Sequence, residues 1–140
     1  MFKSLLVIRQ RRNCVYRTGY HMVWCSKYRR RILTGPIATR LAEILAEVCR
    51  AYGFEIVSLE LQPDHVHLFV SLPPATAPAL AAKLFKGITA RRLRHEFPSL
   101  KQLCREDALW SPSYFVGTVG NVSAETVRRY IEEMQSDKRR

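Results

Sequence analysis

Two kinds of apolar periodicity alternate along this sequence, and their order limits the folds that the chain can adopt. Strands with a period of two are expected over residues 19–25, 54–61, 65–72 and 113–119, and helices over 35–53, 76–95 and from Ser123 onward. The resulting order is strand, helix, strand, strand, helix, strand, helix, which is typical of a ferredoxin-like sheet with one extra helix. We therefore predict an α+β fold: a ferredoxin-like or RRM-like antiparallel sheet with helices on one face.

The second helix has an apolar stripe that we expect to face the core. This stripe consists of Leu80, Leu84 and Ile88. The same face continues into Arg91 and His95, so the last turns are expected to leave the core. Pro98 is expected to end the helix.

Positive charge is concentrated at the start of the chain. The sequence has 23 Lys and Arg against 12 Asp and Glu, for a net charge of +11, and ten basic residues precede the first acid, Glu43. Such a block attracts polyanions and favours nucleic acid as a partner. We predict one domain over residues 1–140, with residues 1–16 as a basic N-terminal arm.

The cysteines and the apolar runs bear on the cellular compartment. None of the four cysteines, Cys14, Cys25, Cys49 and Cys104, belongs to a Cys-x-x-Cys pair, so we expect reduced thiols and no structural zinc. No apolar run reaches the roughly 18 residues of a transmembrane helix, and the short apolar start lacks a small-residue cleavage site. These features predict a cytoplasmic protein that does not enter a membrane.

Two histidines mark the third expected strand. His65 and His67 are two residues apart and therefore point to the same face, while Val66, Leu68 and Val70 fill the other. Two adjacent imidazoles can share one divalent ion and leave its other positions open. Because the motif has only two specified positions, on its own it favours two unrelated histidines on a half-buried strand.

The last helix carries a tyrosine beside its apolar stripe. Val127, Ile131 and Met134 lie at helical spacing and are expected to face the core, with Tyr130 at their flank. A flanking tyrosine is usually a packing residue with its hydroxyl in water. As a nucleophile, a phenol of pKa about 10 needs activation, which a nearby divalent metal could supply.

Five short segments occur here in a characteristic order: YHMVWCSKYR at 20–29, QPDHVH at 62–67, LFKG at 84–87, LWSPSY at 109–114 and VRRYIE at 127–132. Taken together, they resemble the insertion-sequence 200/605 family of transposases, which belong to the HUH (His, hydrophobic, His) group of single-strand nucleases. The order and spacing of the segments make the set specific, although each alone is weak.

The resemblance implies a DNA transposase that nicks and rejoins single-stranded DNA through a 5′-phosphotyrosine intermediate. It implies that His65 and His67 are metal ligands and that Tyr130 is the nucleophile. It also implies a need for Mg²⁺ or Mn²⁺ but not ATP, and recognition of DNA hairpins at the ends of the element. Finally, it implies a homodimer with an active site shared between chains, associated with the nucleoid of a prokaryote.

One position departs from the family pattern. The family usually has Gln four residues after the tyrosine as third metal ligand, whereas this chain has Met134 there and Gln135 one residue later. A thioether is a poor partner for Mg²⁺. Glu133 lies on the Tyr130 side of the helix and offers a hard oxygen, whereas Gln135 points about 140 degrees away. We therefore favour Glu133 over Gln135, with water as the remaining alternative.

Basic residues on the second helix and after the first strand are candidates for contacting the DNA hairpin. They are Lys83, Lys86, Arg91, Arg92, Arg94, Arg29, Arg30 and Arg31. Two other functions stay open. A domesticated enzyme would keep the chemistry without moving its own element. A non-catalytic RNA-binding module would need aromatic residues on the central strands, where this chain has histidines and only Phe69.

Overall fold

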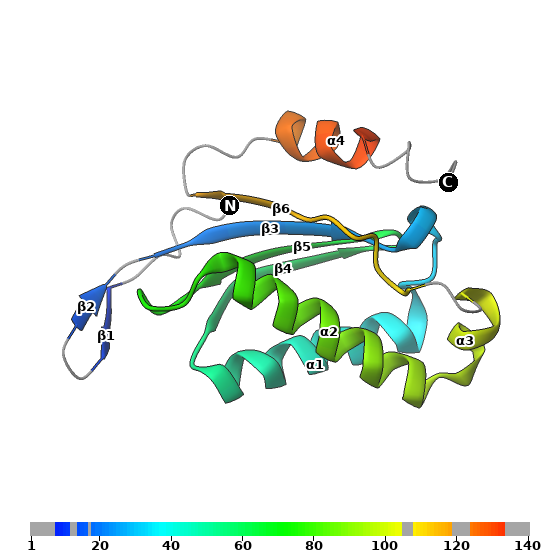
Figure 1. Ribbon diagram of the computed structural model, residues 1–140, viewed down its shortest axis with the longest axis horizontal. Coiled ribbons are helices and arrows are strands. Elements are labelled where there is room, and N and C mark those ends of the chain that lie inside the picture. Colours follow the sequence, from blue (N-terminus) through cyan, green and yellow to red (C-terminus); the bar gives the residue numbers. More distant parts are fainter. Residues whose placement is uncertain (1–7, 12–13, 17, 105–107, 119–123, 134–140) are drawn as a thin grey trace.

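Four strands form a single antiparallel sheet in the order β4–β5–β3–β6 (Figure 1). A computed structural model describes residues 8–11, 14–16, 18–104, 108–118 and 124–133. The strands are β3 (Tyr20–Cys25), β4 (Glu55–Gln62), β5 (His65–Ser71) and β6 (Phe115–Thr118). This strand order confirms the predicted ferredoxin-like sheet, because the two strands joined by the β4–β5 turn pair directly and β3 lies between β5 and β6.

Helices occupy both faces of the sheet, in unequal numbers. The helices are α1 (Gly35–Tyr52), α2 (Pro78–Glu96), α3 (Pro98–Cys104) and α4 (Ala124–Glu133), with a short 3₁₀ turn, η2 (Lys27–Arg29), after β3. Helices α1 and α2 cover one face, and α4 lies on the opposite side (Figure 1). Both long helices have a proline in the first turn, and Gly53 ends α1 in the left-handed conformation that favours glycine.

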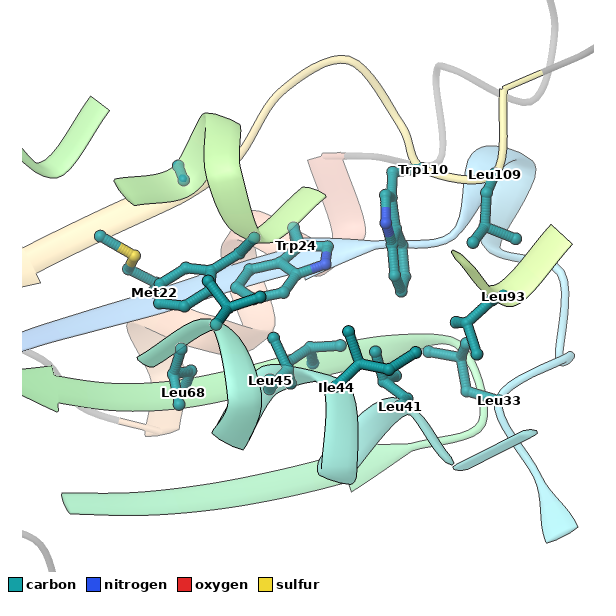
Figure 2. Packing of buried hydrophobic residues seen from close by; sticks show 14 of the residues in the cluster. Met22, Trp24, Leu33, Leu41, Ile44, Leu45, Leu68, Leu93, Leu109 and Trp110 are labelled. Atoms are coloured by element: carbon teal, nitrogen blue, oxygen red, sulfur yellow. The ribbon is translucent and has the colours of Figure 1, made fainter. Parts of the chain in front are cut away.

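The core fills the space between the sheet and the helices α1 and α2 (Figure 2). Met22 and Trp24 point into it from β3, as the alternation of that strand predicts, and both are fully buried. The Trp24 ring stacks on Phe85 of α2 and meets Trp110 edge-on, with centroid distances of 6.0 Å in both cases. The opposite face of β3 and β5 therefore remains available for polar side chains.

The expected core stripe of α2 lies one residue before the buried one, although Leu84 and Ile88 still pack against the core while half-buried. Leu80 is 50% exposed, and the buried positions include Ala81, Phe85, Thr89 and Leu93. Thr89 obscures this periodicity in the sequence, because a polar residue stands inside the stripe. Its hydroxyl accepts the indole N–H of Trp110 at 3.0 Å and donates to the Phe85 carbonyl, so its burial is compensated.

The C-terminal end of α2 also differs from expectation. Leu93 is fully buried, so the last turns stay in the core instead of leaving it. The helix ends at Glu96, close to the predicted stop at Pro98, but Pro98 then begins the short helix α3. Proline suits this position because the first turn of a helix needs no backbone donor.

The basic arm expected over residues 1–16 contains a small hairpin. Strands β1 (Arg9–Arg11) and β2 (Cys14–Tyr16) pair antiparallel and project beyond the main sheet (Figure 1). The Arg9 guanidinium lies 2.6 Å from the Glu55 carboxylate, which ties the hairpin to the start of β4. None of the helices within the described ranges combines the length and apolar character needed to cross a bilayer.

Candidate active site

His65 and His67 lie on the face of β5 that points away from α1 and α2. Their side chains are 17% and 11% exposed, whereas Val66 and Leu68 are fully buried in the core. This is the orientation that the period of two predicts. Two residues on one strand face are about 7 Å apart along the backbone, so the two imidazole rings can converge on one ion.

Asp64 holds one side of the His65 ring. Its Oδ1 atom lies 2.8 Å from His65 Nδ1, and its Oδ2 atom accepts from Arg29 Nε at 3.0 Å. Burial alone would raise the pKa of Asp64, but the hydrogen bonds from His65 and Arg29 outweigh it and leave that pKa below its ordinary value. An ionised carboxylate only accepts, so Nδ1 of His65 carries a proton, and in the neutral ring this tautomer leaves the lone pair on Nε2.

His21 lies beside the histidine pair, on the neighbouring strand β3. Its Nδ1 atom is 3.2 Å from Nε2 of His67, and its ring stacks on Phe69 with centroids 4.3 Å apart. Burial, and to a smaller extent the neighbouring His67, lower the pKa of His21 to about 4. Burial also lowers the pKa of His67. The Glu60 carboxylate, whose Oε1 lies 3.8 Å from His67 Nδ1, raises this pKa but does not offset the effect of burial. Both rings are therefore neutral near pH 7.

Helix α4 carries Tyr130 over the same face of the sheet. The register aligns Phe115 of β6, Val23 of β3 and His67 of β5 in one row, so their side chains share a face. The Tyr130 ring packs against Phe115 with centroids 6.0 Å apart, and its hydroxyl lies 3.2 Å from Ser113 Oγ. One strand separates β6 from β5, which corresponds to about 10 Å between their backbones. Tyr130 and the histidine pair thus share one face of one chain (Figure 1).

The donor set at this face fits an open divalent metal site. His65 and His67 offer two imidazole nitrogens, and a neutral imidazole is a common ligand of divalent metals. Among the described residues, no group of three or more His, Cys, Asp and Glu is arranged to hold an ion. Two fixed protein ligands with free positions match an exchangeable ion that also binds substrate, not a closed structural site.

The candidates for a third ligand lie at the end of α4. Glu133 is the last residue of the helix and is exposed. Met134 and Gln135 lie outside the described residues, so the choice between Glu133 and Gln135 stays a prediction. Glu133 is three residues after Tyr130, which puts both on one side of the helix.

Several of the basic residues predicted to contact DNA bind other parts of the protein. Lys86 donates to the carbonyl of Ser111 at 2.7 Å and to that of Ser113 at 3.0 Å, and burial lowers its pKa. Arg92 pairs with Glu47 of α1 at 2.7 Å. Together with the pairing of Arg29 to Asp64, these contacts give the three residues structural roles, whatever their part in DNA binding.

A groove beside α2 gathers other cations of the predicted set. It encloses about 450 Å³ between the helix and residues 108–114, and Lys83, Arg94 and Tyr114 are among its lining residues. A second hollow of about 460 Å³ includes Arg91 and shares Arg94. Lys83, Arg91 and Arg31 are exposed, while Arg30 and Arg94 are half-buried. Contact of these residues with DNA stays a prediction.

Sequence reasoning missed three residues of this site. Asp64 contacts His65, His21 contacts His67, and Arg29 pairs with Asp64. Of the three, only Arg29 was assigned a role, that of a DNA contact. A carboxylate immediately before His65 was a usable signal. The alternation of β3 puts His21 on the face opposite Met22 and Trp24, but its distance from His67 depends on a register that the sequence does not specify.

Comparison with known proteins gives consistent matches over nearly the whole chain. The family described as "Transposase IS200 like" matches residues 14–134. The ISDra2 transposase TnpA of Deinococcus radiodurans is 38% identical over 133 residues, covering 95% of this chain and 94% of that protein. The transposase for insertion sequence element IS200 of Salmonella typhimurium is 30% identical over 120 residues, covering 85% of this chain and 78% of the relative.

Solved structures agree with these matches. A crystal structure assigned to a transposase of Deinococcus radiodurans R1 has a TM-score of 0.83 and 37% identity, covering 90% of this chain and 97% of that one. A REP-associated tyrosine transposase bound to a REP hairpin has a TM-score of 0.55 and 18% identity, covering 90% of this chain and 67% of that one. The second likeness shows a common fold.

Proposed function

The chain belongs to the IS200-like transposase family, and from this we propose that it nicks and rejoins single-stranded DNA at the ends of a mobile element. The observation that carries the proposal is the shared sheet face of Tyr130 and the pair His65 and His67. A nucleophile and two imidazole ligands on one face form the minimum set for metal-assisted phosphoryl transfer.

Tyr130 is the proposed nucleophile. Its hydroxyl gives up a proton and attacks the scissile phosphorus, and the bond to the 3′ oxygen of the leaving strand breaks. The products are a 5′-phosphotyrosine and a free 3′ hydroxyl. When a second 3′ hydroxyl attacks this phosphotyrosine, the strands are joined and Tyr130 is released. The phosphodiester energy is kept in the tyrosine ester, so no ATP is needed.

His65 and His67 would hold Mg²⁺ or Mn²⁺, with Glu133 or Gln135 as third protein ligand. The bound ion would polarise the scissile phosphate and stabilise the departing 3′ oxygen. Magnesium prefers oxygen ligands and retains water, so a site with two imidazoles binds it weakly and accepts Mn²⁺ as well. Asp64 would orient the His65 ring and His21 the His67 ring.

The proposed substrate is single-stranded DNA that folds into hairpins. The net charge of +11 and the groove with Lys83 and Arg94 support binding to phosphates. A relative of the same fold was solved bound to a REP hairpin. We extend the proposal to a homodimer with a shared active site, acting in the cytoplasm at the nucleoid.

The sheet face argues against the RNA-binding module. Such modules stack bases on exposed aromatic rings of the central strands. Phe69 is the aromatic residue of β5, and it is fully buried beneath the stacked ring of His21. A base therefore has no aromatic platform on this strand.

Trapping the covalent intermediate tests the proposal. The protein is incubated with Mn²⁺ and single-stranded DNA from its own element ends, labelled on the 3′ side of the cleavage site. We expect a denaturation-resistant adduct with the wild type and with Tyr52→Phe, an exposed tyrosine on α1, and none with Tyr130→Phe. Duplex DNA of the same sequence should give none. An adduct with Tyr130→Phe would overturn the assignment of the nucleophile.

A further inference from the structure

The turn that follows β3 adopts an unfavourable backbone conformation. Tyr28 and Arg29 have φ values of 60° and 53°, in the left-handed region, and neither is glycine. For residues with a Cβ atom this region is sterically unfavourable, and it persists where surrounding contacts impose it. Two consecutive residues in this conformation call for a physical explanation.

Hydrogen bonds on several sides hold this turn in place. The Ser26 amide donates to the Asp64 carbonyl at 3.0 Å, and the Ser26 hydroxyl donates to the Arg30 carbonyl at 2.6 Å. The Lys27 amide donates to the Leu109 carbonyl at 2.8 Å. The end of β3 is thus tied to Asp64, the residue that immediately precedes β5.

The strained turn directs Arg29 at Asp64. Arg29 Nε and Nη2 both lie 3.0 Å from Asp64 Oδ2, while Asp64 Oδ1 lies 2.8 Å from Nδ1 of His65. Asp64 is 6% exposed, so its carboxylate is shielded from water and is held by these two partners. A guanidinium, a carboxylate and an imidazole therefore form one chain that ends at a ring of the proposed metal site.

We propose that Arg29 and Asp64 are positioning residues that fix the tautomer and orientation of His65. The inference rests on the proposed function for its consequence, which is metal affinity. The carboxylate accepts the proton on Nδ1, and this leaves Nε2 with a lone pair on the open face. Without Arg29, the Asp64 carboxylate loses the partner on Oδ2 and can turn away from His65, so the ring can adopt both tautomers.

A ring with the proton on Nε2 cannot bind a metal through that nitrogen. Residues that hydrogen-bond to a metal ligand typically raise the metal affinity 10- to 100-fold. Arg29 thus acts on the metal through two intervening hydrogen bonds, although it belongs to the basic residues expected to contact DNA.

Two measurements on the intact chain test the proposal. Long-range ¹H–¹⁵N NMR spectra of the metal-free protein report the tautomer of His65, whose signals are assigned by their loss in His65→Gln. Titration with Mn²⁺, followed by the EPR signal of the free ion, reports metal affinity. The variants are Arg29→Ala, Arg29→Lys and Asp64→Ala, with Arg50→Ala as a control that removes an exposed arginine at the end of α1.

We expect wild type and Arg50→Ala to show the Nδ1–H tautomer alone. Arg29→Ala and Asp64→Ala should show both tautomers and bind Mn²⁺ about 10- to 100-fold more weakly. Arg29→Lys keeps the charge without the planar fork and should lie in between, and it remains informative if Arg29→Ala does not fold. A single Nδ1–H tautomer in folded Arg29→Ala, or unchanged Mn²⁺ affinity in both Arg29 variants, would overturn the proposal. If the wild type binds no Mn²⁺, the proposed function fails, and the tautomer alone decides whether Arg29 positions His65.

Discussion

Nδ1 of His21 lies 3.2 Å from Nε2 of His67, although the two residues are 46 positions apart in the sequence. The contact crosses from β3 to β5 on the face that also carries His65. Both rings are largely shielded from water, and both are held neutral by burial. One ring must therefore donate and the other accept, and metal binding at Nε2 of His67 would replace this hydrogen bond.

The buried pair predicts a loss of stability in mild acid. The pKa of His21 is lowered from 6.5 to about 4 in the folded chain, so its contribution is fully present above pH 6.5 and is lost as the pH falls toward 4. Over this window the free energy of unfolding should fall by about 1.4 kcal/mol per pH unit from His21 alone. His67, whose pKa is also lowered, adds to this slope.

The variant His21→Phe separates the two contributions. It keeps a ring against Phe69 and removes one titrating group, so the slope between pH 6.5 and 4 should become shallower by about one proton. Urea unfolding in the presence of EDTA measures this. His95→Gln, a change at an exposed histidine on α2, should keep the wild-type slope. An unchanged slope in His21→Phe would show that His21 is protonated in the folded chain.

Removing the histidine pair should abolish nicking while the fold persists. His65→Ala and His67→Ala should each lower the cleavage rate of single-stranded DNA more than about 100-fold. Loss of a residue that only hydrogen-bonds to a metal ligand already lowers activity 10- to 100-fold, and loss of the ligand itself should have a larger effect. His95→Ala should cleave at the wild-type rate. Gel assays with Mg²⁺ and circular dichroism measure the two effects. Cleavage by the folded double variant His65→Ala/His67→Ala would remove the metal site from the mechanism.

Local sequence patterns predicted the fold and the face of each central strand, but they could not predict contacts between side chains of different strands. The alternation around His65 and around Trp24 is a local property of a strand, so the inward and outward faces could be assigned correctly. The α2 stripe failed because buried Thr89 depends on a partner, the Trp110 indole, 21 residues away. Asp64 adjoins His65 in the sequence, whereas His21 meets His67 only through the register of β3 and β5, and Arg29 reaches Asp64 from the turn after β3.

Binding of a DNA hairpin should depend steeply on salt, and unequally on the basic residues. Lys83 is exposed beside the groove along α2, whereas Arg92 pairs with Glu47. Lys83→Ala should make the slope of log K against log salt less steep by about one, the contribution of a single phosphate contact. Arg92→Ala should change this slope little. Fluorescence anisotropy between low and moderate salt measures both slopes. The reverse ranking, or an affinity independent of salt, would exclude the groove as the binding surface.

The third metal ligand can be found by comparing two neighbours on the last helix. Glu133→Ala should weaken cleavage about tenfold at limiting Mg²⁺, because Glu133 shares the helix side of Tyr130. Gln135→Ala should have the smaller effect, since its side chain points away if the helix continues. Titration of activity against Mg²⁺ distinguishes the two. If Gln135→Ala is the more harmful change, the helical phase beyond Glu133 differs from a continuous α-helix.

The last prediction concerns whether one chain or two build the active site. Within a chain, Tyr130 packs on Phe115 with β3 between it and the histidine strand. A tyrosine supplied by a second copy to the histidine pair of the first would complete the site in a homodimer. Tyr130→Phe and His65→Ala/His67→Ala should each be inactive alone. Mixed under conditions of subunit exchange, they should recover part of the nicking activity, because some heterodimers contain one site with both halves intact.

The covalent adduct identifies which chain supplies the nucleophile. In a shared site it must form on the chain that lacks the histidine pair, because only that chain retains Tyr130. A size tag on this chain allows the adduct to be assigned on a denaturing gel, and exchange is verified by mass spectrometry of the mixed dimers. If exchange occurs and no adduct forms on either chain, Tyr130 serves its own histidine pair. The contact with Phe115 would then represent the resting position of a nucleophile that acts within one chain.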